Sequence, residues 1–108
     1  INVGGEKVLP QEVENVILDI PFIKDCLVYG ESNAITGQSV SVKIVLEDSQ
    51  ITEFFGTDSP TNIEIKKELR KFCKNKLAPF KIPSKVERIE SLEISERFKK
   101  IRKGGKNG

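Results

Sequence analysis

Histidine, methionine and tryptophan are absent from the 108 residues of this chain, and only two cysteines are present. Without histidine, the sequence lacks the usual general base for a serine or cysteine nucleophile, which argues against a hydrolase. Cys26 and Cys73 lie in apolar stretches and form no Cys-x-x-Cys pair, so we interpret both as small buried hydrophobic residues. No metal site is expected. The absence of methionine, position 1 included, predicts that the chain is a piece of a longer protein.

Long apolar runs are also missing. No stretch approaches the roughly 18 consecutive apolar residues that a membrane span needs, and the N-terminus lacks the basic-then-apolar layout of a signal peptide. We therefore expect no membrane span and a cytoplasmic location. With 37% hydrophobic and 31% charged residues, the composition is that of one globular domain. We expect a single domain over residues 1–108, with a hairpin over 1–9, an α/β body over 10–91 and a basic tail over 92–108.

Hydrophobic periodicity predicts the elements of a small α+β sandwich. Gly4-Gly5, flanked by short extended segments, is typical of a tight hairpin turn with positive φ angles. Apolar residues at helical or alternating spacing predict the elements that follow: a helix over 10–20, strands over 23–29 and 40–46, a helix over 62–77 and a strand over 85–89. We expect a three-stranded, mainly antiparallel sheet with both helices on one face.

Three segments are predicted to be irregular. Residues 31–37 are expected to form a loop between two strands. Residues 47–60 are polar and rich in turn formers, and they precede Thr61-x-x-Glu64, a capping box that marks the start of the second helix. In the segment 78–83, each proline restricts the residue before it to extended geometry, so this segment is expected not to be helical.

Four segments, taken together, resemble landmarks of one protein family. They are residues 1–14 (INVGGEKVLPQEVE), Val28-Tyr29-Gly30, Gly37-Gln38 ahead of the strand over 40–46, and residues 77–83 (LAPFKIP). In this order they resemble the C-terminal domain of adenylate-forming enzymes, the superfamily of acyl-CoA synthetases, nonribosomal peptide adenylation domains and luciferases. Each segment alone is common, but their joint order and spacing are specific. The chain is most similar to an AMP-forming acyl-CoA ligase.

This resemblance implies an acid–thiol ligase. In such an enzyme a carboxylic acid and ATP form an acyl-AMP, and the acyl group then passes to the thiol of CoA or of a carrier-protein phosphopantetheine. The resemblance also implies that ATP, its Mg²⁺ and the acid are bound by an N-terminal adenylation domain that is not in this chain. The chain alone is therefore expected to be inactive. The domain would rotate between one pose for each half-reaction, as a mobile lid.

The resemblance assigns roles to two groups of residues. Gly4, Gly5 and Glu6 would line a narrow passage for the pantetheine arm, where glycine lets a ligand approach the backbone closely. The second group belongs to the basic tail, where the family motif reads roughly Thr-x-x-Gly-Lys-x-x-Arg. An ungapped alignment places Ser95, Phe98, Lys99 and Arg102 at those four motif positions in that order.

Lys99 is accordingly the expected catalytic lysine of the adenylation step. Attack of a carboxylate on the α-phosphate of ATP brings two anions together, and a lysine ammonium stabilises the charge that develops. Phe98 departs from the family's glycine, so Lys100 remains the alternative.

Two other interpretations come from different classes of protein. From Arg97 onward the chain has six basic residues and no acid, which is typical of a nucleic-acid-binding tail. Subtracting these six charges from the net +2 leaves −4 for the preceding residues, and the strands lack glycine-aromatic runs, so we expect no nucleic-acid partner. A stand-alone interaction domain without catalytic ancestry is the other alternative.

Overall fold

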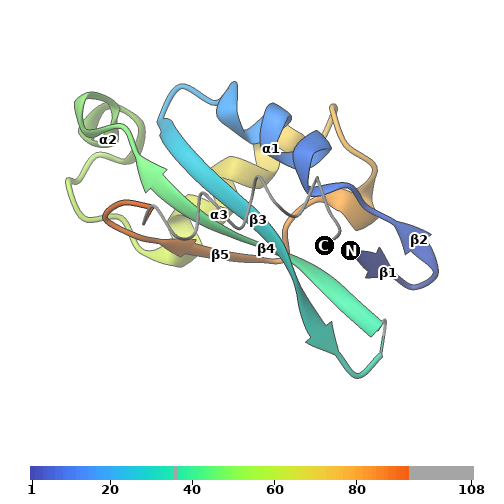
Figure 1. Ribbon diagram of the computed structural model, residues 1–108. Coiled ribbons are helices and arrows are strands. Elements are labelled where there is room, and N and C mark those ends of the chain that lie inside the picture. Colours follow the sequence, from blue (N-terminus) through green and yellow to red (C-terminus); the bar gives the residue numbers. More distant parts are fainter. Residues whose placement is uncertain (36, 93–108) are drawn as a thin grey trace.

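The computed structural model describes residues 1–35 and 37–92. A short hairpin, a helix and two long strands come first, and two further helices, a single 3₁₀ turn and a last strand follow (Figure 1). In chain order the elements are β1 (Asn2–Val3), β2 (Glu6–Lys7), α1 (Pro10–Leu18), β3 (Ile23–Asn33), β4 (Gly37–Leu46), α2 (Asp48–Phe55), α3 (Asn62–Cys73), η1 (Pro79–Lys81) and β5 (Lys85–Arg88).

Strand β4 is the centre of the sheet, which has five strands among the described residues. Its whole length pairs antiparallel with β3, from Ile23 opposite Leu46 to Asn33 opposite Gly37. The other edge of β4 is shared. There β5 runs parallel to its middle, and β1 meets its first residue, because Val3 pairs with Gly37. The β1–β2 hairpin is thereby attached to the sheet at the end where β4 begins.

Helices α1 and α3 lie on the same side of this sheet and touch each other (Figure 1). The alternation along the strands turns one set of side chains toward the helices, where they are nearly or fully removed from solvent. The side chains that meet in this core are Val13 and Ile17 from α1, Ile65, Leu69 and Cys73 from α3, and Cys26, Val28, Val42, Ile44 and Val86 from the strands. The expectation of two helices on one face is confirmed.

Several local predictions from the sequence are also confirmed. Gly4 and Gly5 form the turn of the hairpin with φ angles of +56° and +90°. At the start of α3, the Glu64 N–H donates to Thr61 Oγ1 at 3.1 Å and the Thr61 N–H donates to Glu64 Oε1 at 2.8 Å, which completes the capping box. Cys26 and Cys73 are both buried. These features depend on residues close together in the sequence or on a simple apolar setting.

The prediction of an irregular segment over 47–60 is wrong for its first half. Residues 48–55 form helix α2, which ends at Gly56 with a φ of +72°. The helix is held by packing: the rings of Phe54 and Phe55 meet Phe22 edge-on, with centroids 5.2 and 5.0 Å from the Phe22 centroid. Phe22 lies far from α2 in the sequence. The polar composition of residues 47–60 therefore did not indicate a helix that is stabilised by tertiary contacts.

The boundaries of other elements also differ from the prediction. Residues 31–33 continue strand β3, and residues 37–39 already belong to β4, so both strands extend into the predicted loop. Helix α1 ends at Leu18 and α3 at Cys73, both earlier than expected. Ala78 and Ile82 are extended as predicted, with ψ of 148° and 129°, but residues 79–81 between them form a 3₁₀ turn. The statement that this segment is not helical is therefore wrong for these three residues.

Candidate functional site

The turn of the β1–β2 hairpin is open to its surroundings. A Cβ atom added to Gly4 or Gly5 would meet no heavy atom within 4 Å. What demands glycine here is the backbone, because both φ angles lie in the left-handed region that other residues rarely adopt. Glu6, the third residue of the expected passage, follows directly on β2 and is exposed. The structure thus brings all three expected passage residues to one exposed edge.

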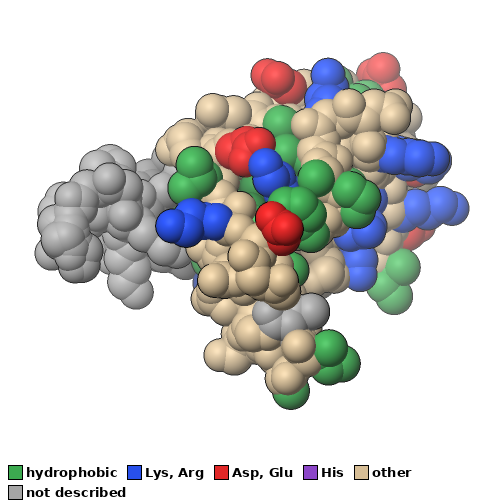
Figure 2. Space-filling model, turned by 90° about the vertical axis from the view of Figure 1, so that its right-hand side faces the viewer, with side chains coloured by type: hydrophobic (Ala, Val, Ile, Leu, Met, Phe, Trp, Pro, Cys, Tyr) green, Lys and Arg blue, Asp and Glu red, His purple; other side chains and the backbone are tan. Residues whose placement is uncertain are grey.

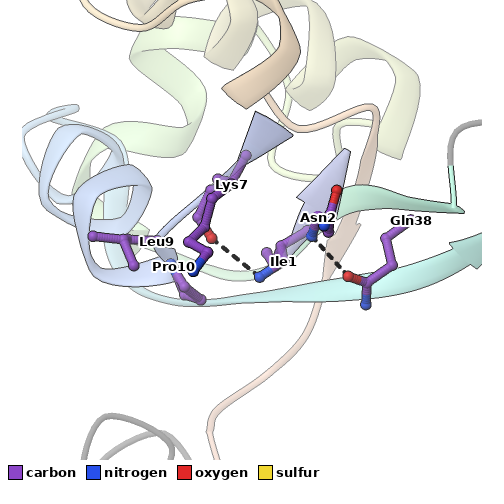
Figure 3. A pocket seen from close by; sticks show the side chains of 7 residues that line it. Ile1, Asn2, Lys7, Leu9, Pro10 and Gln38 are labelled. Carbon is purple, nitrogen blue, oxygen red and sulfur yellow. Dashed lines mark hydrogen bonds between the residues drawn. The ribbon is translucent and has the colours of Figure 1, made fainter. Parts of the chain in front are cut away.

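Hydrogen bonds connect the turn of the hairpin to β1 and to strand β4. The Gly5 N–H donates to Asn2 Oδ1 at 3.0 Å, and the Asn2 N–H donates to Gln38 Oε1 at 2.7 Å. Ile1 and Val8 close the base of the hairpin, since the Val8 N–H donates to the Ile1 carbonyl at 2.7 Å and the Ile1 nitrogen donates to the Val8 carbonyl at 3.1 Å. Figure 3 shows the Asn2–Gln38 and Ile1–Val8 contacts as dashed lines. The hairpin is therefore tied to β4 by a side chain as well as by the sheet.

A hollow of about 300 Å³ lies between the hairpin, the start of α1 and Gln38 (Figure 3). Leu9 stands in its wall with 61% of its surface exposed, so the hollow offers apolar surface to a ligand. Figure 2 views the side of the molecule on which Figure 1 places β1 and β2, and there hydrophobic side chains lie among acidic and basic ones. The lining residues are Ile1, Asn2, Lys7, Val8, Leu9, Pro10 and Gln38.

Gly30 makes room for the side chains of Gln38 and Ile1, which contact the hairpin or belong to its base. A Cβ atom on Gly30 would lie 2.8 Å from Gln38 Nε2 and 3.2 Å from two carbon atoms of the Ile1 side chain. Gly30 on β3 pairs with Val40 on β4, and only the absence of a side chain allows Gln38 and Ile1 to cover it. Two landmarks of the sequence, Gly30 and Gln38, thus meet under the glycine hairpin.

The start of α1 is fixed by two carboxylates. Lys81 Nζ lies 3.0 Å from both oxygens of Glu12, which joins α1 to the 3₁₀ turn across 69 positions of sequence. Glu14 is 1% exposed, and its Oε2 accepts the Val28 N–H at 2.9 Å, on the edge of β3 that carries no strand among the described residues. The segments PQEVE and PFKIP therefore meet in space, and together they set the direction in which the chain leaves the hairpin.

A second polar cluster lies on the sheet face away from α1 and α3. Ser41 donates a hydrogen bond to Glu31 at 2.6 Å, and Lys85 Nζ lies 3.3 Å from the same carboxylate. The Ser41 hydrogen bond, with the Lys85 contact next, lowers the pKa of Glu31 below its ordinary value. The hydrogen bond and the charge of Glu31 raise the pKa of Lys85. The contacts of this cluster link β3, β4 and β5 across the sheet.

The expected lysines cannot be placed beside the hairpin. Lys99 and Lys100 lie outside the described residues, as do Ser95, Phe98 and Arg102. The structure adds Asn2 and Gln38, for which sequence reasoning gave no role. In the sequence, Gln38 stands out only as part of the Gly37-Gln38 landmark, and no pattern pairs it with Asn2, which is 36 positions away.

Two kinds of feature are missing from residues 1–35 and 37–92. No group of three or more histidine, cysteine, aspartate or glutamate side chains there is arranged to hold a metal ion. None of the helices in the same part of the chain is long and apolar enough to span a membrane.

A family model and individual relatives of known function match this chain and agree with each other. A family model described as the AMP-binding enzyme C-terminal domain matches residues 12–99. The chain is 34% identical over 92 residues to an oxalate–CoA ligase of Saccharomyces cerevisiae and 36% identical over 88 residues to 4-hydroxybutyrate–CoA ligase 2 of Metallosphaera sedula. These alignments cover 85% and 81% of this chain but only 15% and 14% of the two relatives.

A solved structure shows the same fold. The o-succinylbenzoate CoA synthetase of Bacillus subtilis, in complex with its acyl-adenylate intermediate, matches with a TM-score of 0.71 and 28% sequence identity. The match covers 94% of this chain and 18% of that one. Three CoA-ligating relatives named for three different acids therefore carry a domain of this kind.

Proposed function

Because the chain belongs to the AMP-binding enzyme C-terminal domain family, we propose that it is the mobile C-terminal domain of an AMP-forming acid–thiol ligase. The carboxylate of an acid attacks the α-phosphorus of ATP, pyrophosphate leaves, and an acyl-AMP forms. A thiol then attacks the acyl carbon, AMP leaves, and a thioester remains. The family match, which spans most of the chain and unites CoA ligases, is the observation that carries this proposal. It favours the enzyme over the nucleic-acid and stand-alone alternatives.

The ligands of the reaction divide between two parts of the enzyme. We propose that ATP, its Mg²⁺ and the acid bind chiefly to an N-terminal domain in the part of the relatives that this chain does not cover. The described residues support this division, because they contain no glycine-rich phosphate loop and no cluster of metal ligands. The thiol substrate is CoA or the phosphopantetheine of a carrier protein, and CoA is favoured by the relatives' names.

Gly4, Gly5 and Glu6 form one side of the passage through which the thiol arm reaches the acyl-AMP. Their backbone fits an extended arm, since the space where side chains would stand is empty and Leu9 offers apolar surface nearby. A side chain on Gly5 would project into that space. The hairpin therefore acts in the second half-reaction, when the thiol approaches.

Lys99 acts in the first half-reaction. Its ammonium stands between the acid's carboxylate and the α-phosphate of ATP, where it stabilises charge that grows in the transition state. Rotation of the whole domain then removes this lysine and brings the hairpin to the same place. One small domain thereby serves both steps in turn.

Substitution of the lysines in the full-length enzyme tests this assignment. We expect Lys99→Ala to lower the adenylation rate by about 10² to 10³, which corresponds to roughly 3 to 4 kcal/mol of lost transition-state stabilisation. Thioester formation from supplied acyl-adenylate should survive. The measurement is pyrophosphate exchange for the first step and thioester release for the second.

Lys100→Ala, the neighbouring charge, is the matched control. If only Lys100→Ala impairs adenylation, the catalytic lysine is Lys100 and the ungapped alignment is off by one position. If both variants lose both half-reactions equally, the two steps do not use the domain in separate poses.

A further inference from the structure

We propose that Gln38 and Asn2 are positioning residues of the thioester-forming step, because they form a hydrogen-bonded chain from strand β4 to the Gly5 backbone. This inference rests on the proposed function of the glycine hairpin, and it adds the residues that determine where the hairpin stands. Neither side chain needs to touch the thiol for this role. Each acts through the backbone of the turn.

The chain of contacts has two links. Gln38 Oε1 accepts the Asn2 N–H at 2.7 Å, and Asn2 Oδ1 accepts the Gly5 N–H at 3.0 Å. The first link crosses from β4 to β1, and the second crosses the hairpin to the residue at its tip. The position of Gly5 is therefore connected to a central strand of the sheet through two side-chain oxygens.

Ile1 and Val3 pack against the core and Val8 is buried in it, but the hydrogen-bonded attachment of the hairpin to the sheet is short. Its strands have two residues each, and among the described residues its ladder to β4 consists of the single pair Val3–Gly37. A two-stranded hairpin of this size is at best marginally stable by itself in water. The angle at which it stands against the sheet must therefore depend on contacts beyond the ladder, and the Gln38–Asn2 link lies at that junction.

Gly30 leaves room for the Gln38 amide. The Gln38 amide occupies space that a Cβ atom on Gly30 would enter, at 2.8 Å from Nε2. With no side chain on Gly30, the amide lies in this space, and from there Oε1 accepts the Asn2 N–H. Gly30, Gln38 and Asn2 thus form one support, built from parts that lie far apart in the sequence.

The expected consequence is selective for one half-reaction. Transfer to a thiol requires the thiol sulfur to be aligned with the acyl carbon, and a displacement of about 1 Å in a positioning element can lower a rate by up to about 10²-fold. Adenylation does not use the hairpin in the proposed mechanism. Loosening the support should therefore reduce thioester formation and leave adenylation unchanged.

The test uses the full-length enzyme and three variants of the support. Gln38→Leu removes the acceptor at similar size, and Asn2→Ala removes the second acceptor. Asn2→Asp keeps an oxygen at that place. We expect kcat/KM for CoA, measured with supplied acyl-adenylate, to fall about 10- to 100-fold in the first two variants and to stay within about threefold in Asn2→Asp.

Gln11→Leu is the matched control for Gln38→Leu. Gln11 also makes a hydrogen bond, to Asn15 Oδ1 at 3.1 Å, but on the exposed face of α1. It should leave both half-reactions unchanged. Pyrophosphate exchange at the wild-type rate in every variant reports that the enzyme is folded, so a merely structural defect is recognised by loss of both activities.

Gly30→Ala gives a second approach to the same support. The added Cβ displaces the Gln38 amide, so we expect the same loss of thioester formation, and the double variant Gly30→Ala/Gln38→Leu should lose little more than either alone. Additive losses would contradict a common support.

The outcomes separate this inference from the proposed function. Suppose that Gly5→Leu blocks thioester formation, while Gln38→Leu and Asn2→Ala behave like Gln11→Leu. The hairpin then acts in thioester formation as proposed, but Gln38 and Asn2 do not position it. If Gly5→Leu itself leaves thioester formation intact, the proposed function of the hairpin is wrong.

Discussion

The β1–β2 hairpin and the α/β body differ in the contacts that hold them. In the body, apolar side chains such as Ile17, Ile65 and Leu69 are completely buried between the sheet and the helices. The tip of the hairpin has open space around it and is connected to β4 mainly through hydrogen bonds. Hydrophobic burial is strong but non-directional, whereas hydrogen bonds are weaker and fix geometry. The body therefore supplies stability and the hairpin supplies a defined position.

The largest expected effect belongs to the body. Phe22 is fully buried, and its ring meets those of Phe54, Phe55 and Phe72 at centroid distances of 5.2, 5.0 and 5.9 Å. Phe22→Ala should lower the free energy of unfolding by about 3 to 5 kcal/mol, because it leaves a cavity among these rings. Urea unfolding of the chain, followed by circular dichroism, measures the change.

Leu9→Ala gives the comparison from the hairpin end. Leu9 is 61% exposed, so its loss should change the free energy of unfolding by no more than about 0.5 kcal/mol. Equal destabilisation by Phe22→Ala and Leu9→Ala would remove the distinction between the two regions.

The next effect concerns two glycines with similar backbones in different regions. Gly5 and Gly56 have φ angles of +90° and +72°, and neither would place a Cβ within 4 Å of another atom. Gly5→Leu and Gly56→Leu should each destabilise the chain by about 1 to 2 kcal/mol through the same left-handed strain. Only Gly5→Leu should also block thioester formation in the full-length enzyme, by about 10²-fold, with adenylation preserved.

Gly56→Leu is thus the internal control for backbone strain. The assay measures the two half-reactions separately in both variants. A thioester defect of the same size in Gly56→Leu would mean that strain, and not obstruction of the passage, explains the result for Gly5→Leu.

Local structure could be predicted from the sequence wherever neighbouring residues determine it. The Gly4-Gly5 turn and the Thr61–Glu64 capping box follow from local backbone preferences, and the apolar alternation of β4 identifies its buried face. The order of these elements, with the resemblance, led to the correct family and to a sheet with two helices on one face.

Where distant residues meet, the sequence was a poor guide. Helix α2 depends on contacts with Phe22, although Ile51, Phe54 and Phe55 at helical spacing, followed by Gly56, form a local signal that could have revealed it. The link from Gln38 to Asn2 spans 36 positions and the Glu12–Lys81 contact 69, and no periodic pattern records either pair. The support of the candidate site therefore became visible only in the structure.

The smallest expected effect concerns the pH dependence of the body. Glu31 on β3 accepts a hydrogen bond from Ser41 and contacts Lys85, and these contacts lower its pKa in the folded chain. A lowered folded pKa means that the contribution of Glu31 to stability is present above the ordinary glutamate pKa of about 4.3 and is lost as the pH falls through the folded value. Lys85, whose pKa is raised, contributes below its ordinary pKa of about 10.4 and loses that contribution as the pH rises through its folded value.

Glu31→Gln should therefore lower the Tm slightly near pH 7, and its difference from the wild type should vanish once the pH has fallen below the folded pKa of Glu31, where the carboxyl group is neutral in both the folded and the unfolded chain. The same difference should shrink again as the pH rises from the ordinary lysine pKa through the raised folded pKa of Lys85, because the contribution of that charge is lost over this range. Thermal unfolding across this range measures the difference, and Glu68→Gln, which removes one member of the exposed Lys71–Glu68 pair on α3, is the matched control.

Because the cluster lies in the body, both half-reactions should keep their rates in Glu31→Gln. A Tm difference that is independent of pH would show that the Glu31 charge contributes nothing, and a selective loss of thioester formation would show that this face of the sheet, and not the hairpin alone, positions the thiol.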